Sequence, residues 1–404
     1  MKVGIINAYY YPEIIGGAEL SVKKLAEGLV NKGLEVFVIT TGENNVVDYI
    51  EGVKVYRLKT NNFFRVGKYK NPIKKVTDRL LDIYNPFNFK KINIILRKEK
   101  PNIVHTNNLY GISPIVYNAA KINSIKIVHT LRDYYILCPR VNLLNKKNEI
   151  CNNPCISCQL YRGVNRYLFK NIDALTAPSQ FTNRIFNDND FFKHINSYTI
   201  HNAIEIDYKE LEETRLYRIN KKRDSLRFVY LGALSKHKGI IELINSFSKI
   251  ENDSVSLEIA GEGNLRGFIQ GEAKKDNRIK LHRFLNEKEK KNLLLDSDIL
   301  VIPSMWYEPF GRVVIEAYKY GLPVIGSNLG GIPEIIDNYS TGVIFNPESE
   351  DSLINAFNYF IDNKKLINEI VNNCIKKLHE FDLDIQIEQF VDLYSSLVDS
   401  GDHR

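Results

Sequence analysis

Short apolar segments alternate with helical segments along this chain, and few folds accommodate that pattern. The first apolar run, "KVGIIN" at 2–7, has the length of a buried strand. The segment "GGAELSVKKLAEGLVNKG" at 16–33 follows with apolar residues at helical spacing, and Gly33 is a typical helix end. A second run, "EVFVIT" at 35–40, completes a β-α-β unit. Repeated units of this kind predict an α/β fold, with a parallel sheet covered by helices on both faces.

The same alternation occurs in both halves of the chain. A polar, charge-rich stretch at 205–225 interrupts it, and a new strand pattern, "RFVYLGA", begins at residue 227. A length of 404 residues also predicts about two or three domains. We expect two Rossmann-like, doubly wound domains facing across a cleft, with ligands at the carboxyl ends of the strands. The expected limits are an N-terminal domain at 1–204, a linker at 205–225, a C-terminal domain at 226–385 and a helix at 386–404 that packs back on the first domain.

Composition and terminal sequence indicate where the protein works. Hydrophobic residues make up 44% of the chain, and the formal net charge is +7. The stretch "MKVGIINAYYYP" lacks the long apolar region and the small-residue cleavage site of a signal peptide. No apolar run approaches the roughly 18 residues of a membrane-spanning helix. We therefore expect a cytoplasmic protein whose cysteines are reduced.

The segment 65–100 is strongly basic and carries aromatic residues among its lysines. One interpretation is a solvated helix face. The other is a surface that contacts anionic lipid or an anionic acceptor, with Phe87 and Phe89 beside Lys90 and Lys91. The second interpretation predicts a peripheral protein at the inner face of a membrane. We expect no nucleic-acid partner, because no nucleic-acid-binding motif accompanies the charge.

Four cysteines fall in one part of the N-terminal domain: Cys138, Cys151, Cys155 and Cys158. Cys155 and Cys158 have the spacing of a metal-binding knuckle, whereas Cys138 and Cys151, with twelve residues between them, do not. Structural zinc, reduced free thiols and an iron–sulfur centre of a redox enzyme are the three interpretations. In the first two, the loop at 138–158 shapes the acceptor side and takes no part in the chemistry.

Two other patterns argue against common cofactors. "AGEGNLRG" at 260–267 follows a strand, but its glycine spacing differs from a dinucleotide fingerprint and no ribose-binding acid follows. We interpret it as a tight turn that brings Gly263 near the cleft. The Asp-x-Asp pair at 296–298 precedes its strand, whereas a metal-binding pair belongs beyond a strand's carboxyl end. We therefore expect neither NAD(P) nor a catalytic metal.

The most informative stretch is "PSMWYEPFGRVVIEAYKYGLPVIGSNLGGIPEII" at 303–336. A strand ends at its start, a loop carries Glu308, and a helix that begins near Gly311 carries Glu316. The free N–H groups and positive dipole end of such a helix suit a phosphate group. The paired glycines of "NLGG" predict a second backbone cradle. A capped helix with incidental acids would leave this combination of features unexplained.

These motifs resemble those of one enzyme family. "EPFGRVVIE", in which Glu308 and Glu316 enclose seven residues, is similar to the donor-site signature of family 4 of the retaining, GT-B-type glycosyltransferases (group 1). "YYYPEIIGGAE", "VYLGALSKHKGIIELI" and "LEIAGEGNL" stand in the order typical of the family, so the resemblance covers most of the chain. It implies a GT-B fold, a nucleoside diphosphate sugar as donor, retention of anomeric configuration and no catalytic metal.

The resemblance also implies roles for particular residues. Glu316 would hydrogen-bond the ribose hydroxyls, and Glu308 would contact the donor sugar. Lys238 would neutralise the diphosphate and stabilise the leaving group as its charge develops. The residues implied in donor binding are Gly16, Gly17, Lys238, Gly263, Glu308, Phe310, Gly311 and Glu316.

One departure from the family pattern concerns the phosphate site. The family commonly has an arginine five residues before the lysine of "KG", and here that position is Ala233. We take Lys236 as a candidate substitute for the missing charge.

A second departure concerns the reacting sugar. Arg132 stands where the family often has a histidine, followed as usual by an aspartate, Asp133. We take Arg132 and Asp133 as candidate catalytic residues. His129 fits a buried strand-end histidine, and His105 is a candidate general base with little support.

The sequence thus favours a hexosyltransferase-type glycosyltransferase of polysaccharide biosynthesis, with a saccharide or glycolipid acceptor. One alternative is a GT-B-type epimerase, which would convert sugar nucleotides without an acceptor. Another is a non-catalytic subunit that binds sugar nucleotides or membranes. The iron–sulfur enzyme is the third.

Overall fold

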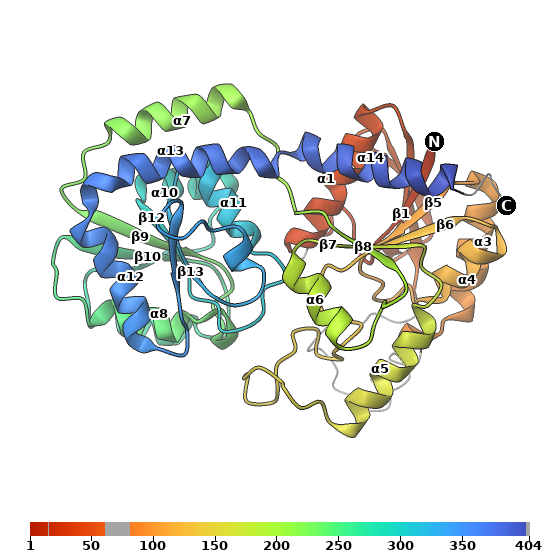
Figure 1. Ribbon diagram of the computed structural model, residues 1–404, viewed down its shortest axis with the longest axis horizontal. Coiled ribbons are helices and arrows are strands. Elements are labelled where there is room, and N and C mark those ends of the chain that lie inside the picture. The colour runs from red at the N-terminus through yellow and green to blue at the C-terminus, as the bar shows by residue number, and fades with distance from the viewer. Residues whose placement is uncertain (15, 61–80, 401–404) are drawn as a thin grey trace. The chain divides into compact units, whose positions relative to one another are not determined.

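A computed structural model of the chain describes residues 1–14, 16–60 and 81–400 (Figure 1). Unit 1 of the fold comprises Met1–Val141, Pro154–Asn202 and Leu383–Arg404, and unit 2 comprises Asn142–Asn153 and Ala203–Asp382. Each unit contains a parallel sheet with helices, which confirms the predicted α/β class and its two Rossmann-like domains. Of the basic segment predicted to contact lipid, residues 65–80 lie outside the described part of the chain.

The sheet of unit 1 has the strand order β3-β4-β2-β1-β5-β6-β7-β8. Neighbouring strands are parallel, except that β3 runs antiparallel to β4 at the edge. The central strands consist of nearly continuous buried residues, as expected for strands covered on both faces. The strands are β1 (Lys2–Ile6), β2 (Glu35–Gly42), β3 (Val46–Ile50), β4 (Val53–Lys59), β5 (Ile103–Thr106), β6 (Lys126–Thr130), β7 (Ala174–Ala177) and β8 (Asn196–Thr199).

The helices of unit 1 include the C-terminal helix of the chain. That helix, α14, packs against α1, where Ile387 lies so close to Gly28 that a Cβ there would be 2.0 Å from Ile387 Cδ1. The sequence placed this last helix on the first domain from residue 386 onward, and in the structure it begins at Leu383. The helices are α1 (Gly17–Asn31), α3 (Pro86–Glu99), α4 (Ile115–Ile122), α5 (Ile156–Leu168), α6 (Gln180–Asp188) and α14 (Leu383–Asp399).

The sheet of unit 2 is parallel throughout and has the order β11-β10-β9-β12-β13-β14. Numbered from its own first strand, this is 3-2-1-4-5-6, the order of doubly wound nucleotide-binding sheets. The order in which strands are added to the sheet reverses between β9 and β12, and ligands bind such sheets beyond the carboxyl ends at this point. The strands are β9 (Leu226–Leu231), β10 (Val255–Ala260), β11 (Ile279–Leu281), β12 (Ile299–Ile302), β13 (Val324–Ser327) and β14 (Gly342–Phe345).

The polar stretch interpreted as a linker forms a helix of unit 2. Asp207 caps this helix, because its carboxylate accepts the N–H groups of Lys209 and Glu210. The helix packs against α13, and the buried Arg218 donates to the carbonyl of Tyr320 at 2.7 Å. The helices of unit 2 are α7 (Tyr208–Asn220), α8 (Ile240–Ser248), α9 (Arg266–Ala273), α10 (Glu287–Asp296), α11 (Arg312–Lys319), α12 (Glu350–Asp362) and α13 (Ile367–Leu378), with short 3-10 turns η1 (Lys236–Lys238), η2 (Ile332–Glu334), η3 (Lys364–Leu366) and η4 (His379–Phe381).

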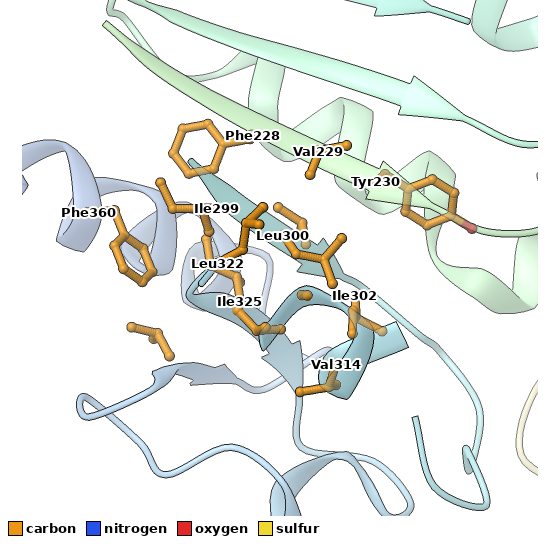
Figure 2. Close-up of a cluster of buried hydrophobic side chains, with 14 of the residues drawn as sticks. Phe228, Val229, Tyr230, Ile299, Leu300, Ile302, Val314, Leu322, Ile325 and Phe360 are labelled. Atoms are coloured by element: carbon orange, nitrogen blue, oxygen red, sulfur yellow. The ribbon is translucent and has the colours of Figure 1, made fainter. Parts of the chain in front are cut away.

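The core of unit 2 fixes the elements that carry the candidate site. Side chains of β9 and β12 meet in the centre of the sheet, and Val314 of α11 packs into the same cluster (Figure 2). Burial of this apolar surface holds the start of α11 beside the end of β12. The loop between those two elements is therefore positioned from both sides.

Helix length sets one further limit. In the described ranges, none of the helices has both the length and the apolar character needed to cross a bilayer.

Candidate functional site

The side chain of Glu308 is the centre of a polar cluster in unit 2. It lies in the loop between β12 and α11, and only 13% of it is exposed. Its Oε1 accepts three hydrogen bonds: from Lys238 Nζ at 2.6 Å, Ser304 Oγ at 2.8 Å and Trp306 Nε1 at 2.9 Å. The predicted pair Glu308 and Lys238 is thus brought together, although 70 residues separate them in the chain.

The electrostatics of this cluster keep the carboxylate charged. Burial alone would raise the pKa of Glu308, but the Lys238 ammonium and the hydrogen bonds from Lys238, Ser304 and Trp306 outweigh it. The pKa of Glu308 therefore lies below its ordinary value. Lys238 also lies over the Trp306 ring, 5.0 Å from its centroid, a cation–π distance.

His237 completes the surroundings of the tryptophan. Its ring stands edge-on to Trp306 with 5.6 Å between centroids, and its carbonyl accepts the N–H of Met305. Burial and the Lys238 charge lower the pKa of His237, although Glu308 opposes the shift. A neutral imidazole at neutral pH leaves Lys238 as the cation of the cluster.

The backbone of the Glu308 loop is held by the "NLGG" segment. Gly331 N–H donates to the Glu308 carbonyl at 2.8 Å, and Gly330 has a left-handed φ of 67°. A Cβ at Gly330 would lie 2.3 Å from that same carbonyl oxygen, so only glycine fits there. The prediction of a second phosphate cradle is therefore partly wrong, because the Gly331 N–H already donates to an acceptor within the protein.

Glu316 lies on α11 in a separate pair of ionic contacts. Lys290 Nζ of α10 is 2.7 Å from one carboxylate oxygen, and Arg312 Nε is 3.2 Å from the other. The carboxylate is one-fifth exposed, so a ligand can reach it. Two basic groups thus orient the acid that the sequence assigns to the ribose.

The remaining donor-site predictions in unit 2 concern backbone. The Phe310 side chain is buried against Phe381, with 5.9 Å between ring centroids, so only its backbone is available to a ligand. Gly311 is the left-handed residue that precedes α11, with φ 106°. Gly263 lies in the turn after β10, and a Cβ there would be 2.3 Å from the carbonyl oxygen of Leu234.

A cavity of about 700 Å³ adjoins the Glu308 loop within unit 2. Met305 and Tyr307 of the loop line it, together with Asn328 before the "GG" and residues of the segment 142–153. Lys236, the candidate substitute for the charge missing at residue 233, is exposed in its wall. Space beside the polar cluster is therefore available for a ligand larger than a single phosphate.

In unit 1, Arg132 is fixed at the carboxyl ends of three strands. Its Nε donates to Asn107 Oδ1 at 2.9 Å and its Nη1 to Asn202 Oδ1 at 2.5 Å. Asn107 follows β5, Arg132 follows β6 and Asn202 follows β8. This edge is where ligands bind parallel sheets.

Asp133 is half-buried beside Arg132 in the chain. It accepts the Tyr110 hydroxyl at 2.8 Å and the Tyr135 N–H at 2.8 Å. Burial raises the pKa of Asp133 to about 6, with a contribution from the Glu19 charge, although the two hydrogen bonds oppose the shift. The group therefore changes charge close to neutral pH.

The start of α1 contributes the predicted glycines. Gly16 N–H donates to Glu19 Oε2 at 2.8 Å, and Gly17 is the first residue of the helix. Glu19 is buried and is the acid whose charge acts on Asp133. Gly16, Gly17, Arg132 and Asp133 all belong to unit 1, whereas Lys238, Gly263, Glu308, Phe310, Gly311 and Glu316 belong to unit 2.

His105, the candidate base, and His129, the predicted buried strand-end histidine, are both core residues. His105 is fully buried, and its ring nitrogens lie 2.6 Å from the Tyr394 hydroxyl and 2.6 Å from Thr130 Oγ1. His129 Nδ1 lies 2.8 Å from Thr106 Oγ1. Burial lowers the pKa of His105 well below its ordinary value and that of His129 to about 3. His105 therefore does not fit the role of a general base.

Of the four cysteines, Cys155 and Cys158 lie close together and the other two lie elsewhere. Cys155 and Cys158 approach to 3.4 Å at the start of α5, while Cys138 is buried in unit 1 and Cys151 belongs to unit 2. Across the residues that the structure describes, no group of three or more His, Cys, Asp or Glu side chains is placed to hold a metal ion. Structural zinc at the four cysteines stays a prediction.

Sequence reasoning missed the residues that hold Glu308, Glu316 and Arg132 in place. They are Ser304 and Trp306 at Glu308, Lys290 and Arg312 at Glu316, and Asn107 and Asn202 at Arg132. Trp306 alone had a visible signal, because it is the chain's only tryptophan and stands two residues before Glu308.

Comparison with known proteins defines the class. A family model for "Glycosyltransferase Family 4" matches residues 15–208, and one for "Glycosyl transferases group 1" matches residues 213–377. The chain belongs to the family 4, group 1 glycosyltransferases, and is accordingly a transferase of glycosyl groups.

Individual relatives extend over the whole chain. An uncharacterized 42.6 kDa protein in the cps region of Klebsiella pneumoniae is 31% identical, over 98% of this chain and 100% of the relative. An Escherichia coli enzyme, UDP-Gal:alpha-D-GlcNAc-diphosphoundecaprenol alpha-1,3-galactosyltransferase, is 24% identical over 98% of each chain. The fold is shared with Anabaena HepE in complex with UDP, with a TM-score of 0.70 and 18% identity over 98% of this chain and 100% of that chain.

Proposed function

We propose that the protein is a retaining glycosyltransferase that moves a hexose from a nucleoside diphosphate sugar to a saccharide or glycolipid acceptor. The observation that carries the proposal is the Lys238–Glu308 pair, held at 2.6 Å beyond the carboxyl end of the unit 2 sheet. In the proposed mechanism, Lys238 faces the diphosphate and stabilises it as it leaves with increased negative charge. Glu308, kept ionised by its three donors, accepts hydrogen bonds from donor sugar hydroxyls.

Other residues of unit 2 bind the nucleotide. Glu316 accepts the ribose hydroxyls, with Lys290 and Arg312 fixing the orientation of its carboxylate. The backbone of Phe310 and Gly311 contacts the sugar, and Gly263 lets the chain approach the phosphates. We infer that Arg132 and Asp133 of unit 1 take part in the reaction, that Gly16 and Gly17 lie near phosphate or acceptor, and that no protein nucleophile is used.

The relatives suggest which substrates to try first. A uridine nucleotide is the first choice, since HepE was solved with UDP and the E. coli relative uses UDP-Gal. That relative acts on a sugar carried by diphosphoundecaprenol, and the Klebsiella relative is encoded in a cps region. We therefore propose a role in polysaccharide biosynthesis, with a lipid-linked sugar as acceptor.

A lipid-linked acceptor implies work at a membrane, and we propose a cytoplasmic enzyme that contacts the inner face. Helix α3 supports this, because Phe87 and Ile94 are exposed by 64% and 58% and stand among the exposed Lys90, Arg97 and Lys98. The test is co-sedimentation with anionic vesicles. Binding that falls steeply with added salt supports an electrostatic contact through α3, and no binding at low salt contradicts it.

Donor binding can be followed through the single tryptophan. Trp306 donates to Glu308 and lies under Lys238, so a diphosphate that draws Lys238 away should change its emission. We expect saturable changes with UDP or another nucleoside diphosphate, and a matching rise in melting temperature. A screen in which no nucleoside diphosphate changes either signal would contradict the proposal.

Turnover separates the transferase from its alternatives. Release of nucleoside diphosphate from a sugar nucleotide should require an acceptor. Conversion of the sugar nucleotide without acceptor would instead identify an epimerase. Donor binding without turnover on any lipid-linked or free saccharide would identify a non-catalytic subunit.

A further inference from the structure

Helix α5 of unit 1, labelled in Figure 1, carries four exposed apolar side chains. Ile156, Leu160, Val164 and Tyr167 are spaced by four, four and three residues, so they lie on one face of the helix. Their exposed fractions are 77%, 68%, 44% and 67%. Single exposed apolar residues are ordinary, but four in a row on one helix form a continuous patch.

The opposite face of α5 fastens the helix to unit 1 through polar groups. Asn165 is buried and donates to the Ile136 carbonyl at 2.9 Å. The Tyr161 hydroxyl donates to the Tyr135 carbonyl at 2.8 Å, and Arg162 Nε donates to the Leu137 carbonyl at 2.9 Å. A surface helix usually turns its apolar stripe inward, and here these three hydrogen bonds hold it outward.

Charge identifies the surface that the stripe fits. The helix sequence "ISCQLYRGVNRYL" has arginines and no acidic residue. Arg166 donates to the Asn189 carbonyl at 2.9 Å within unit 1, whereas Lys170 Nζ sits beside the stripe, 4.0 Å from the centroid of the Tyr167 ring. A second copy of the helix would bring like charges together, whereas an anionic bilayer offers both a hydrocarbon phase and negative headgroups.

We propose that α5 is a membrane-docking helix that lies in the interface of an anionic bilayer, with Ile156, Leu160, Val164 and Tyr167 in the acyl-chain region and Lys170 at the headgroups. The inference deepens the proposed function, on which its purpose rests: it brings a transferase to an acceptor carried on lipid. It differs from the contact through α3, where cations outnumber the exposed apolar residues.

The experiment compares full-length variants in co-sedimentation with vesicles of phosphatidylcholine containing phosphatidylglycerol, at low and high salt. The double variant Leu160→Asn/Tyr167→Asn keeps the polar anchors of α5 and the charge of the protein. We expect its partition coefficient to fall at least about tenfold at high salt, where apolar burial carries the binding. The control is Phe284→Asn, which removes an aromatic side chain of 70% exposure from unit 2 and should bind as wild type.

Three results would overturn the proposal. They are failure of the wild type to bind vesicles, equal binding by the double variant, and an equal loss in Phe284→Asn. A dimer of the wild type in light scattering that the double variant dissolves would assign the stripe to a second copy instead. Far-UV circular dichroism and the thermal unfolding midpoint verify that each variant is folded. Vesicle binding without any turnover would refute the transferase mechanism and leave the α5 assignment standing.

Discussion

Lys238 Nζ lies 2.6 Å from Glu308 Oε1, in a cluster that also contains the chain's only tryptophan. The pair joins a 3-10 turn after β9 to the loop after β12, the two strands between which the strand order of the sheet reverses. Each charge offsets the cost of burying the other. A site that is organised before the donor arrives avoids reorganisation when the leaving group develops charge.

Removal of the Glu316 carboxylate should weaken nucleotide binding. Glu316→Ala deletes the proposed acceptor of two ribose hydroxyl bonds, so we expect UDP affinity to fall by about tenfold or more, in line with 1.5–3 kcal/mol for hydrogen bonds to charged groups. Titration with UDP, followed by Trp306 emission, measures this affinity. Glu287→Ala, an exposed acid on α10, serves as the control. Undiminished UDP affinity in Glu316→Ala would remove Glu316 from the site.

Asp133 should give the protein a pH-dependent stability. Its pKa is raised from 3.8 to about 6, so between those values the folded state binds more protons than the unfolded state. The free energy of unfolding therefore falls as pH rises through this window. Asp133→Asn should abolish that part of the pH dependence, and the exposed control Asp392→Asn should keep it. Urea unfolding at a series of pH values checks this, and parallel curves for Asp133→Asn and wild type would contradict it.

Arg218 should be important for the stability of unit 2. Its guanidinium donates to the carbonyls of Tyr320, Ser297 and Leu294. Arg218→Met would leave these buried acceptors unpaired, and we expect a loss of about 3 kcal/mol. Denaturant unfolding measures the change, with the half-buried Arg215→Met of the same helix as the charge-matched control. Equal stability of the two variants would show that the carbonyls find other donors.

The helix within residues 205–225 was not predicted, and the reason is physical. Only Leu211, Thr214 and Arg218 are buried in α7, and two of these three are polar, so the helix lacks the apolar stripe that identifies a helix in sequence. Its buried contacts combine Leu211 in the core of unit 2 with the bonds from Arg218 to distant carbonyls. In contrast, the buried central strands were predictable, because buried parallel strands are apolar runs, whereas the largely exposed edge strand β3 was not predicted.

In the candidate site, too, some residues were predictable from the sequence and others were not. Glu308, Glu316 and Lys238 were predictable because they stand in local motifs beside strand ends and a helix start. Their partners were not, because Lys290 meets Glu316 across 26 residues and the contact depends on how α10 packs beside α11. Likewise, Gly331 looked available for a phosphate until the structure showed its N–H bonded to Glu308.

Removal of divalent metal should leave the reaction intact. In the proposed mechanism, Lys238 supplies the positive charge that a divalent cation would otherwise place at the diphosphate. We expect unchanged turnover after dialysis against EDTA in metal-free buffer. Loss of turnover that magnesium or manganese restores would contradict this prediction.

The most direct test of the central claim is the turnover number of Lys238→Met with saturating sugar nucleotide and acceptor. We predict that the turnover number falls by about 100-fold or more, because removal of one donor to a developing negative charge typically costs an enzyme that much. Lys288→Met, which removes an exposed lysine of α10, should match the wild type. Turnover of Lys238→Met equal to that of the control would contradict the assignment of Lys238 to the leaving group.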